Sequence, residues 1–227
     1  MSNAAALPQA VKEKIVGYWG GGLLHESYGS TEAGIVTNLR PQHQLTRKQS
    51  VGHAFALNTV RLLDDRGNEV APGEVGELYS RSPYLFNGYW NQPQETAAAL
   101  RDGWVTAGDL ARQDEDGFIY IVDRKKDMVV TGGINVYPRE IEEVLHKHPA
   151  IVEAAVIGVP DDYFGEALRA FVVLRPGMNV ATDELDVHCR ATLAGYKVPK
   201  EFRFIAALPR NAGGKVLKKD LRNLATS

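Results

Sequence analysis

A run of consecutive charged residues, Asp123-Arg124-Lys125-Lys126-Asp127, separates two parts of the chain that have different patterns. Before the run, from Val51 to Tyr89, short alternating stretches are separated by turn sequences, which is typical of a small barrel or sandwich. After it, from Pro138 to Ile205, helical and strand patterns alternate, which indicates a small α+β sandwich. The chain is therefore predicted to be an α+β protein, with a small β-barrel-like subdomain followed by an α+β domain.

The predicted domains are residues 1–125 and 126–227, and the length of 227 residues is enough for both. On composition alone, the charged run between them is expected to be a solvated turn. Helical patterns cover residues 5–17 (with Pro8 in the first turn), 93–100, 138–148 and 183–193. Strand patterns cover residues 23–28, 58–63, 77–81, 118–122, 128–130, 151–159, 168–174 and 202–205.

Charge and apolar content argue against several classes of protein. Lys and Arg number 26 and Asp and Glu 28, so the net charge of −2 favours neither nucleic acid nor an anionic membrane. No apolar run could span a bilayer, so we expect no integral membrane association, and the N-terminus has no signal-peptide pattern. The one cysteine, Cys189, suits a reducing cytoplasm and is expected to pack as a small residue on a helix. The oligomeric state is left open.

The segment Tyr28-Gly29-Ser30-Thr31-Glu32 has the chemistry of a phosphate or metal site. A glycine lets a ligand approach the backbone, hydroxyls can bond phosphate oxygens, and a carboxylate can hold Mg²⁺. Taken alone, the commoner explanation is a loop with a helix N-cap.

Further along, Thr106-Ala107-Gly108-Asp109 places an aspartate after a glycine turn, where its carboxylate could accept two ribose hydroxyls. In isolation this segment is a plain turn. Arg124 offers a fork of donors for ribose or phosphate. Gly132 and Gly133 would let a narrow ligand pass close to the backbone, but a β-hairpin with a glycine bulge explains them as well.

Near the C-terminus, Leu208-Pro209-Arg210-Asn211-Ala212-Gly213-Gly214-Lys215 places a lysine on a glycine-rich loop. Such a loop can close and bring a compact positive charge to a phosphoryl oxygen. The alternative is a flexible basic tail, which is frequent near chain ends.

The order and spacing of these segments carry more weight than any one of them. With them, the chain resembles the adenylate-forming superfamily of acyl-CoA synthetases, non-ribosomal peptide adenylation domains and beetle luciferases. The matching segments are Tyr28–Glu32; Gly88-Tyr89-Trp90; Asp102-Gly103-Trp104 with Thr106–Asp109; Asp123–Asp127; Gly132-Gly133-Ile134-Asn135-Val136-Tyr137-Pro138 with Glu140-Ile141-Glu142; and Pro209-Arg210-Asn211-Ala212 to Gly214-Lys215.

The resemblance implies roles in binding ATP and AMP. Tyr28 would stack on adenine, in a loop whose Gly29 and Ser30 also contact the nucleotide. Thr31 would contact the α-phosphate and Glu32 would support Mg²⁺. Asp109 would hold both ribose hydroxyls, with Arg124 as a second ribose contact.

The resemblance also implies a switch between two half-reactions. Lys215 would bridge the carboxylate and the α-phosphate while the adenylate forms. Lys126 would be the hinge about which the C-terminal domain rotates. Gly132 and Gly133 would then line the tunnel for the pantetheine arm of coenzyme A.

One departure from the family pattern is large. The Ser/Thr/Gly-rich phosphate loop of the family lies upstream of its tyrosine–glycine motif, and this chain has no such segment. We therefore expect this chain to be a C-terminal fragment of a synthetase, and the fragment to be inactive alone. The complete synthetase would act on a carboxylic acid, which by resemblance is a fatty acid. Gly213 and Lys218 also differ from the residues that the family often has at these positions, but these differences are mild. The alternatives are an adenylation domain that loads a carrier protein and a non-catalytic nucleotide-binding fragment.

Overall fold

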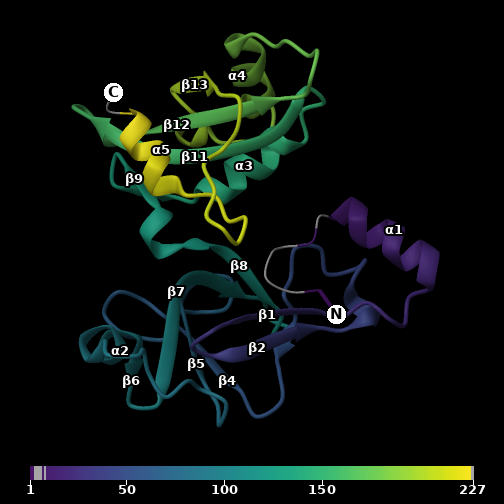
Figure 1. The fold of residues 1–227 in the computed structure, drawn as a ribbon, viewed down its shortest axis with the longest axis vertical. Coiled ribbons are helices and arrows are strands. Elements are labelled where there is room, and N and C mark those ends of the chain that lie inside the picture. Colours follow the sequence, from purple (N-terminus) through teal and green to yellow (C-terminus); the bar gives the residue numbers. More distant parts are fainter. Residues whose placement is uncertain (3–6, 8, 226–227) are drawn as a thin grey trace. The chain divides into compact units, whose positions relative to one another are not determined.

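The computed structural model describes the chain except residues 3–6, 8 and 226–227. The chain divides into two compact units, Met1–Lys125 (unit 1) and Lys126–Ser227 (unit 2) (Figure 1). None of the helices in the described part combines the length and the apolar character that a bilayer crossing needs.

Unit 1 contains two antiparallel sheets, and helix α1 precedes the strands of the first one. The first sheet has the order β1-β2-β3, and the second has the order β4-β5-β7-β6 with β8 paired to β7. The elements are α1 (Gln9–Trp19), β1 (Glu26–Ser30), β2 (Gly34–Leu39), η1 (Pro41–His43), β3 (His53–Ala54), β4 (Thr59–Leu63), β5 (Val75–Arg81), α2 (Pro93–Ala99), β6 (Leu100–Arg101), β7 (Trp104–Gln113) and β8 (Ile119–Arg124).

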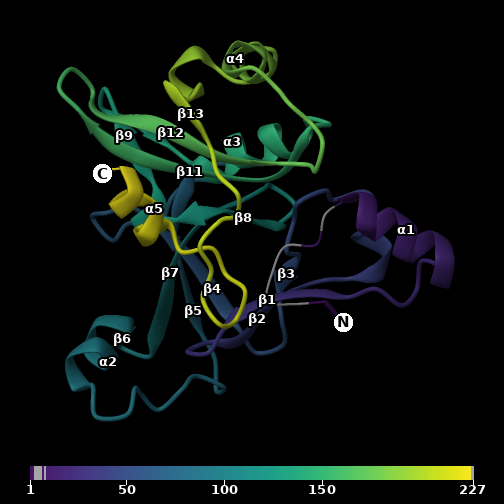
Figure 2. The ribbon, with the colours of Figure 1, turned by 45° about the horizontal axis from the view of Figure 1, so that its top comes forward.

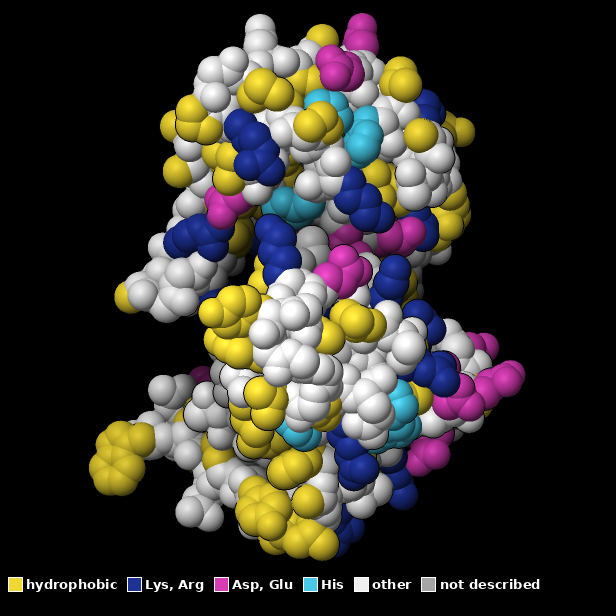
Figure 3. Space-filling model, turned by 90° about the vertical axis from the view of Figure 1, so that its right-hand side faces the viewer, with side chains coloured by type: hydrophobic (Ala, Val, Ile, Leu, Met, Phe, Trp, Pro, Cys, Tyr) yellow, Lys and Arg dark blue, Asp and Glu magenta, His cyan; other side chains and the backbone are white. Residues whose placement is uncertain are grey.

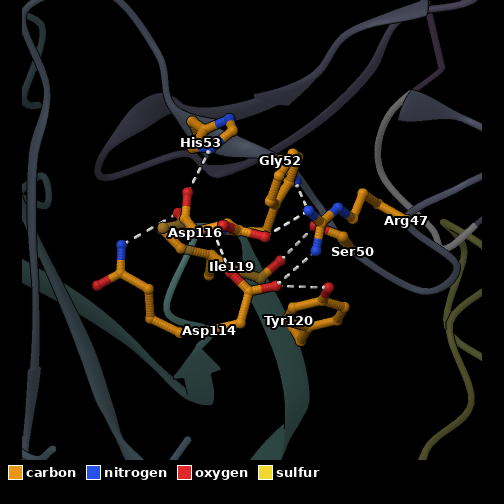
Figure 4. A network of polar contacts seen from close by, with 11 residues as sticks. Arg47, Ser50, Gly52, His53, Asp114, Asp116, Ile119 and Tyr120 are labelled. Carbon is orange, nitrogen blue, oxygen red and sulfur yellow. Dashed lines mark hydrogen bonds and ion pairs between the residues drawn. The ribbon is translucent and has the colours of Figure 1, made fainter. Parts of the chain in front are cut away.

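The two sheets of unit 1 are joined at Ile119, whose side chain is fully buried. Val51 donates its N–H to the Ile119 carbonyl at 2.9 Å, and Ile119 donates its own to the Gly52 carbonyl at 2.9 Å (Figure 4). Gly52 has a φ of +88°, and an added Cβ would lie 2.0 Å from the carbonyl oxygen of Asn38. Only glycine fits this crossing point between the sheets.

Arg47 fastens the loop before β3 to the turn between β7 and β8 (Figure 4). Its guanidinium lies 3.4 Å from Asp114 Oδ2 and 2.5 Å from Asp116 Oδ2, and 4.4 Å from the centre of the Phe118 ring. Asp114 also accepts the hydroxyl of Tyr120 at 2.9 Å. The β7–β8 hairpin is therefore held at its turn as well as along its strands.

Unit 2 is one five-stranded sheet with helices on both faces. The order is β10-β9-β12-β11, with β13 parallel to β12 and the other pairs antiparallel. The elements are β9 (Val129–Thr131), β10 (Ile134–Val136), α3 (Pro138–His146), β11 (Ile151–Asp161), β12 (Gly165–Leu174), α4 (Thr182–Arg190), η3 (Gly195–Lys197), β13 (Glu201–Phe204) and α5 (Lys218–Ala225); the 3-10 turn η2 (Lys125–Asp127) joins the units.

The side chains of β11 point alternately to the two faces of the sheet, and helices cover both faces (Figure 2). Ala154 and Val156 face the core that contains α3 and α4. Ala155 and Ile157 face the opposite side, where they pack with Leu221 of α5. A strand covered on both faces is expected to be apolar on both, as β11 is from Ala154 to Val159.

The structure confirms the predicted α+β fold, and it differs from the sequence-based expectations in detail. Residues 106–109, expected as a turn, lie inside the long strand β7. Asp123 belongs to β8 and is buried, so the charged run is not a solvated turn throughout. Helix α1 begins at Gln9, while Pro8 lies outside the described residues. Cys189 is buried on α4 as expected, and burial raises the pKa of its thiol to about 11.

A buried ion pair ties α1 to β1, and its removal should destabilise unit 1. Lys12 pairs with Glu26, and their side chains are 3% and 7% exposed. We predict that Lys12→Met lowers the free energy of unfolding by about 3 kcal/mol, because it leaves a buried carboxylate unpaired. The double variant Lys12→Met/Glu26→Leu should recover most of that loss, because it removes both charges.

Urea unfolding followed by tryptophan fluorescence measures this effect, since Trp19, Trp90 and Trp104 all belong to unit 1. Lys14→Met, at an exposed position of the same helix, is the control. A Lys12→Met protein as stable as the parent would contradict the prediction.

Candidate functional site

A bulge in β7 positions Asp109. Tyr79 of β5 pairs with Thr106, but Glu77, two residues earlier, pairs with Leu110, so extra residues of β7 are looped out between them. Gly108 has a φ of +74° and donates its N–H to the Thr106 hydroxyl at 3.0 Å. Bulges of this kind turn a side chain to a new direction and are common next to functional sites.

Asp109 lies at the centre of a group of three side chains in unit 1. It is the direct partner of Arg124 in the β7–β8 pairing, and Arg124 Nε lies 3.2 Å from its Oδ1. The hydroxyl of Tyr28 donates to its Oδ2 at 2.6 Å. The carboxylate is buried, with 7% of the residue exposed, while the Arg124 side chain is 46% exposed.

The chemistry of this group suits a diol. Burial, the Asp109 charge and the hydrogen bond to it raise the pKa of the Tyr28 hydroxyl far above its ordinary value, so it stays a donor. Asp109 Oδ2 accepts from Tyr28 and Oδ1 is ion-paired with Arg124, and each oxygen has lone pairs for a further donor. A vicinal diol can supply two such donors at once.

Glu32 is a second acidic group in unit 1. Although its partial burial opposes ionisation, hydrogen bonds from Tyr89 and Ser30 lower the pKa of its carboxyl below the ordinary value. The Tyr89 hydroxyl donates to Glu32 Oε1 at 2.5 Å, which raises the pKa of Tyr89 to about 12. Among the residues described, no three His, Cys, Asp or Glu side chains are grouped to hold a metal ion. Glu32 alone could give a metal ion one carboxylate ligand.

The turn after β1 holds the other residues of the first segment. Residues 31–33 connect β1 to β2, so no helix N-cap is present here. Ser30 Oγ accepts the N–H of Ala33 at 3.2 Å, and Thr31 is exposed. An added Cβ at Gly29 would lie 2.0 Å from the Gly34 carbonyl oxygen, so the hairpin itself requires this glycine.

In unit 2, Gly132 and Gly133 form the two-residue turn of the β9–β10 hairpin. Their φ angles are +56° and +79°, which suit a tight hairpin turn, and no bulge interrupts the pairing. Gly132 lines a pocket of about 570 Å³. Sequence analysis missed three other lining residues, Arg190, Tyr196 and Lys200. Tyr196 and Lys200 lie close together in the sequence between α4 and β13. This pairing of an aromatic with a basic residue is the signal that could have pointed to the pocket.

Lys215 is exposed on a separate loop of unit 2, whose backbone is closed rather than free. Arg210 and Val216 form a bridge across the loop, and Asn211 Oδ1 accepts the Lys215 N–H at 2.9 Å. The Arg210 guanidinium donates to the Gly214 carbonyl at 2.5 Å. The loop therefore presents the lysine on a defined turn and not on a loose tail.

Contact is shown only within parts of the predicted site. The structure brings Tyr28, Asp109 and Arg124 together in unit 1, and Ser30 with Glu32 in the same unit. Lys126, Gly132, Gly133 and Lys215 belong to unit 2. Tyr89, which contacts Glu32, belongs to a matching segment of the sequence, but the sequence alone indicated no role for it.

Comparison with known proteins identifies the family. The sequence model described as "AMP-binding enzyme" matches residues 1–90, and the one described as "AMP-binding enzyme C-terminal domain" matches residues 140–215. A long-chain-fatty-acid–CoA ligase of Bacillus subtilis is 46% identical over 222 residues, which are 97% of this chain and 40% of that protein. The chain therefore belongs to the AMP-binding enzyme family, and it spans about 40% of the length of this curated relative.

Comparison with solved structures supports the same family. O-succinylbenzoate coenzyme A synthetase from Bacillus subtilis, in complex with AMP, is similar with a TM-score of 0.86 and 32% identity over 97% of this chain and 44% of that one. The amide bond synthetase McbA from Marinactinospora thermotolerans has a TM-score of 0.86 and 35% identity over 95% of this chain and 44% of that one. The fatty-acid ligase and the O-succinylbenzoate synthetase are named for different acids, so the family alone does not define the acid.

The contact between Tyr89 and Glu32 can be tested by titration. We predict that Tyr89→Phe raises the pKa of Glu32 toward its ordinary value, because the lost donor favours the charged carboxylate. Since the folded pKa of Glu32 is depressed, its charge stabilises the fold above the unfolded pKa, and this stability is lost as pH falls through the folded pKa. The variant should therefore lose less stability on acidification.

Carbon-13 NMR of the Glu32 carboxyl measures that pKa directly. Tyr84→Phe, at a residue of unit 1 that is 57% exposed, is the matched control. An unchanged Glu32 titration in Tyr89→Phe would show that the hydrogen bond has no energetic effect.

Proposed function

We propose that this chain is the C-terminal part of an ATP-dependent acyl-CoA synthetase, which adenylates a carboxylic acid and transfers the acyl group to coenzyme A. The observation that carries the proposal is the buried Asp109 carboxylate held between Tyr28 and Arg124 in a member of the AMP-binding enzyme family. The AMP complex of one structural neighbour and the ligase names of the relatives support it.

Unit 1 would bind the nucleotide. Asp109 accepts both ribose hydroxyls, Arg124 adds a donor beside them, and the ring of Tyr28 stacks on adenine. Thr31 is exposed at the β1–β2 turn, where its hydroxyl can reach the α-phosphate. Glu32 gives one oxygen to Mg²⁺, which would neutralise phosphate charge when bound.

Unit 2 would supply a different group to each half-reaction. Attack of a carboxylate on the α-phosphate brings two anions together, and the exposed Lys215 ammonium can neutralise both. In the pocket beside Gly132, Tyr196 offers an aromatic face, and Lys200 and Arg190, which are ion-paired with Asp161 and Asp186, could turn to a phosphate by exchanging those partners. These are the groups that a phosphorylated adenine nucleotide such as that of coenzyme A needs. Rotation about Lys126 would exchange the lysine for the glycine hairpin.

The acid is proposed to be a fatty acid of medium or long chain. The 46% identity with a long-chain-fatty-acid–CoA ligase supports this choice of acid. We propose that the enzyme is cytoplasmic. The test is acyl-CoA formation by the longest natural polypeptide that contains this chain, with fatty, aryl and dicarboxylic acids as substrates. Activity with aryl acids alone would overturn the fatty-acid assignment, and transfer to a carrier protein but not to coenzyme A would overturn the ligase.

Lys215 is predicted to act in only one half-reaction. In that longer enzyme, Lys215→Ala should lower adenylate formation at least about a hundredfold, since a positioned charge on the reacting group is lost. Thioester formation from supplied acyl-AMP should be spared. The two rates are measured by pyrophosphate exchange and by acyl-CoA release, with Lys219→Ala, an exposed lysine of α5, as the control. Equal loss of both half-reactions would contradict this role.

Lys126 is predicted to act through its backbone. Lys126→Pro should spare adenylate formation and slow thioester formation, because proline fixes φ at the hinge. Glu115→Pro is the control, since residue 115 follows Asp114 in a turn closed by the Gly117 N–H at 2.9 Å, where proline is well accepted. Normal overall turnover of Lys126→Pro would place the hinge elsewhere.

A further inference from the structure

On the unit 1 side of the join, Lys125 is anchored by its side chain. The Nζ atom lies 2.7 Å from Asp65 Oδ1 and 3.0 Å from Glu77 Oε2, and these hydrogen bonds raise the pKa of Lys125 above its ordinary value. Asp65 is 85% exposed, so its ion pair is expected to contribute little. Glu77 is 13% exposed, and it is therefore the stronger anchor.

Glu77 also connects this anchor to the nucleotide side of unit 1. Its Oε1 accepts the hydroxyl of Thr106 at 2.8 Å, and that hydroxyl accepts the N–H of Gly108 at 3.0 Å. The β7 bulge and Lys125 are therefore held by the two oxygens of one carboxylate. The chain up to Lys125 belongs to the same body as Asp109.

On the unit 2 side, Arg222 of α5 holds the residues that follow. Its Nη2 atom lies 3.2 Å from Asp127 Oδ1 and within 3.5 Å of the Lys126 carbonyl oxygen. Asp127 is 13% exposed, which makes the pair more than a solvated surface contact. Leu221, fully buried with Phe171, fixes the position of α5 on the sheet, so Arg222 holds Asp127 to the body of unit 2.

We propose that Lys125 and Arg222 are positioning residues that confine the rotation between the units to the three torsions between the Lys125 Cα atom and the Lys126 carbonyl. The anchors hold the Lys125 side chain on one side, and the Lys126 carbonyl and the Asp127 side chain on the other. The ψ angle of Lys125 and the φ and ψ angles of Lys126 lie between them. A short hinge moves two rigid bodies along a defined path, whereas a longer one allows many.

The anchors can be tested in the 227-residue chain by nitrogen-15 relaxation, which reports backbone order residue by residue. In the parent, low order parameters should be confined to Lys126. In Arg222→Ala they should extend to Asp127 and Met128, and in Lys125→Ala they should extend to position 125. Arg222→Lys should restore much of the order at Asp127, because it keeps a charge that can reach the carboxylate.

Arg203→Ala is the matched control, since Arg203 contacts α5 at the Leu224 carbonyl at 3.3 Å without touching the hinge. It should leave the hinge order parameters at the parent values. Unchanged order at Asp127 and Met128 in Arg222→Ala would overturn the proposal, as would an equal loosening by Arg203→Ala. If Arg222→Ala does not fold, the Lys125→Ala variant decides the same question from the other side.

The value of the anchors for catalysis rests on the proposed function, and a second measurement separates the two claims. In the longer enzyme, Arg222→Ala should slow thioester formation about tenfold, the size of effect expected for the loss of a charged hydrogen bond, with adenylate formation nearly unchanged. Unchanged thioester formation would overturn the link between the anchors and the domain switch. Absence of acyl-CoA formation in the parent would overturn the proposed function, while the relaxation data would still judge the anchors.

Discussion

The pairing of β7 with β8 positions several parts of unit 1. It sets Asp109 opposite Arg124, and the bulge before Asp109 turns its carboxylate toward Tyr28. At its turn, the hairpin is tied by Arg47 to the loop that enters β3 (Figure 4). At its other end, β8 runs directly into Lys125. One hairpin therefore carries the proposed ribose site, the contact between two sheets and the approach to the proposed hinge.

The charges of the molecule are used locally and not as a general field. On the face shown in Figure 3, Lys and Arg side chains lie among Asp and Glu side chains. The cations that matter are placed one at a time: Arg124 beside a buried carboxylate, Lys125 on Glu77, and Arg222 on Asp127. Each has a mostly buried partner, and this is the setting in which an ion pair has energetic weight.

Local chemistry made part of the fold predictable from the sequence. The turn after β4 follows from Asp64, whose Oδ1 accepts the N–H groups of Arg66 and Asn68 at 2.9 and 2.8 Å. The hairpin at Gly132 and Gly133 follows from the glycine pair. The bulge in β7 was not predictable in this way, because it exists only in the register between β7 and β5.

The candidate site was also predictable from the sequence only in part. The order of the motifs pointed to Tyr28, Asp109 and Arg124 by resemblance, and the structure supplies their contacts. The Tyr89 contact with Glu32 and the Glu77 contact with Lys125 join residues far apart in sequence, so no local pattern announces them. Gly29, interpreted from the sequence as room for a ligand, is required by the Gly34 carbonyl of its own hairpin.

If Asp109 holds the two hydroxyls of a ribose, as we propose, the 227-residue chain should distinguish AMP from 2′,3′-dideoxy-AMP. NMR titration is suitable because it detects weak binding and locates it. We expect AMP to perturb the signals of Tyr28, Asp109 and Arg124 and to bind the unsubstituted chain more tightly than the dideoxy nucleotide does. Asp109→Ala should remove this difference. Equal binding of the two nucleotides by the unsubstituted chain, or a difference that persists in Asp109→Ala, would contradict this role of Asp109.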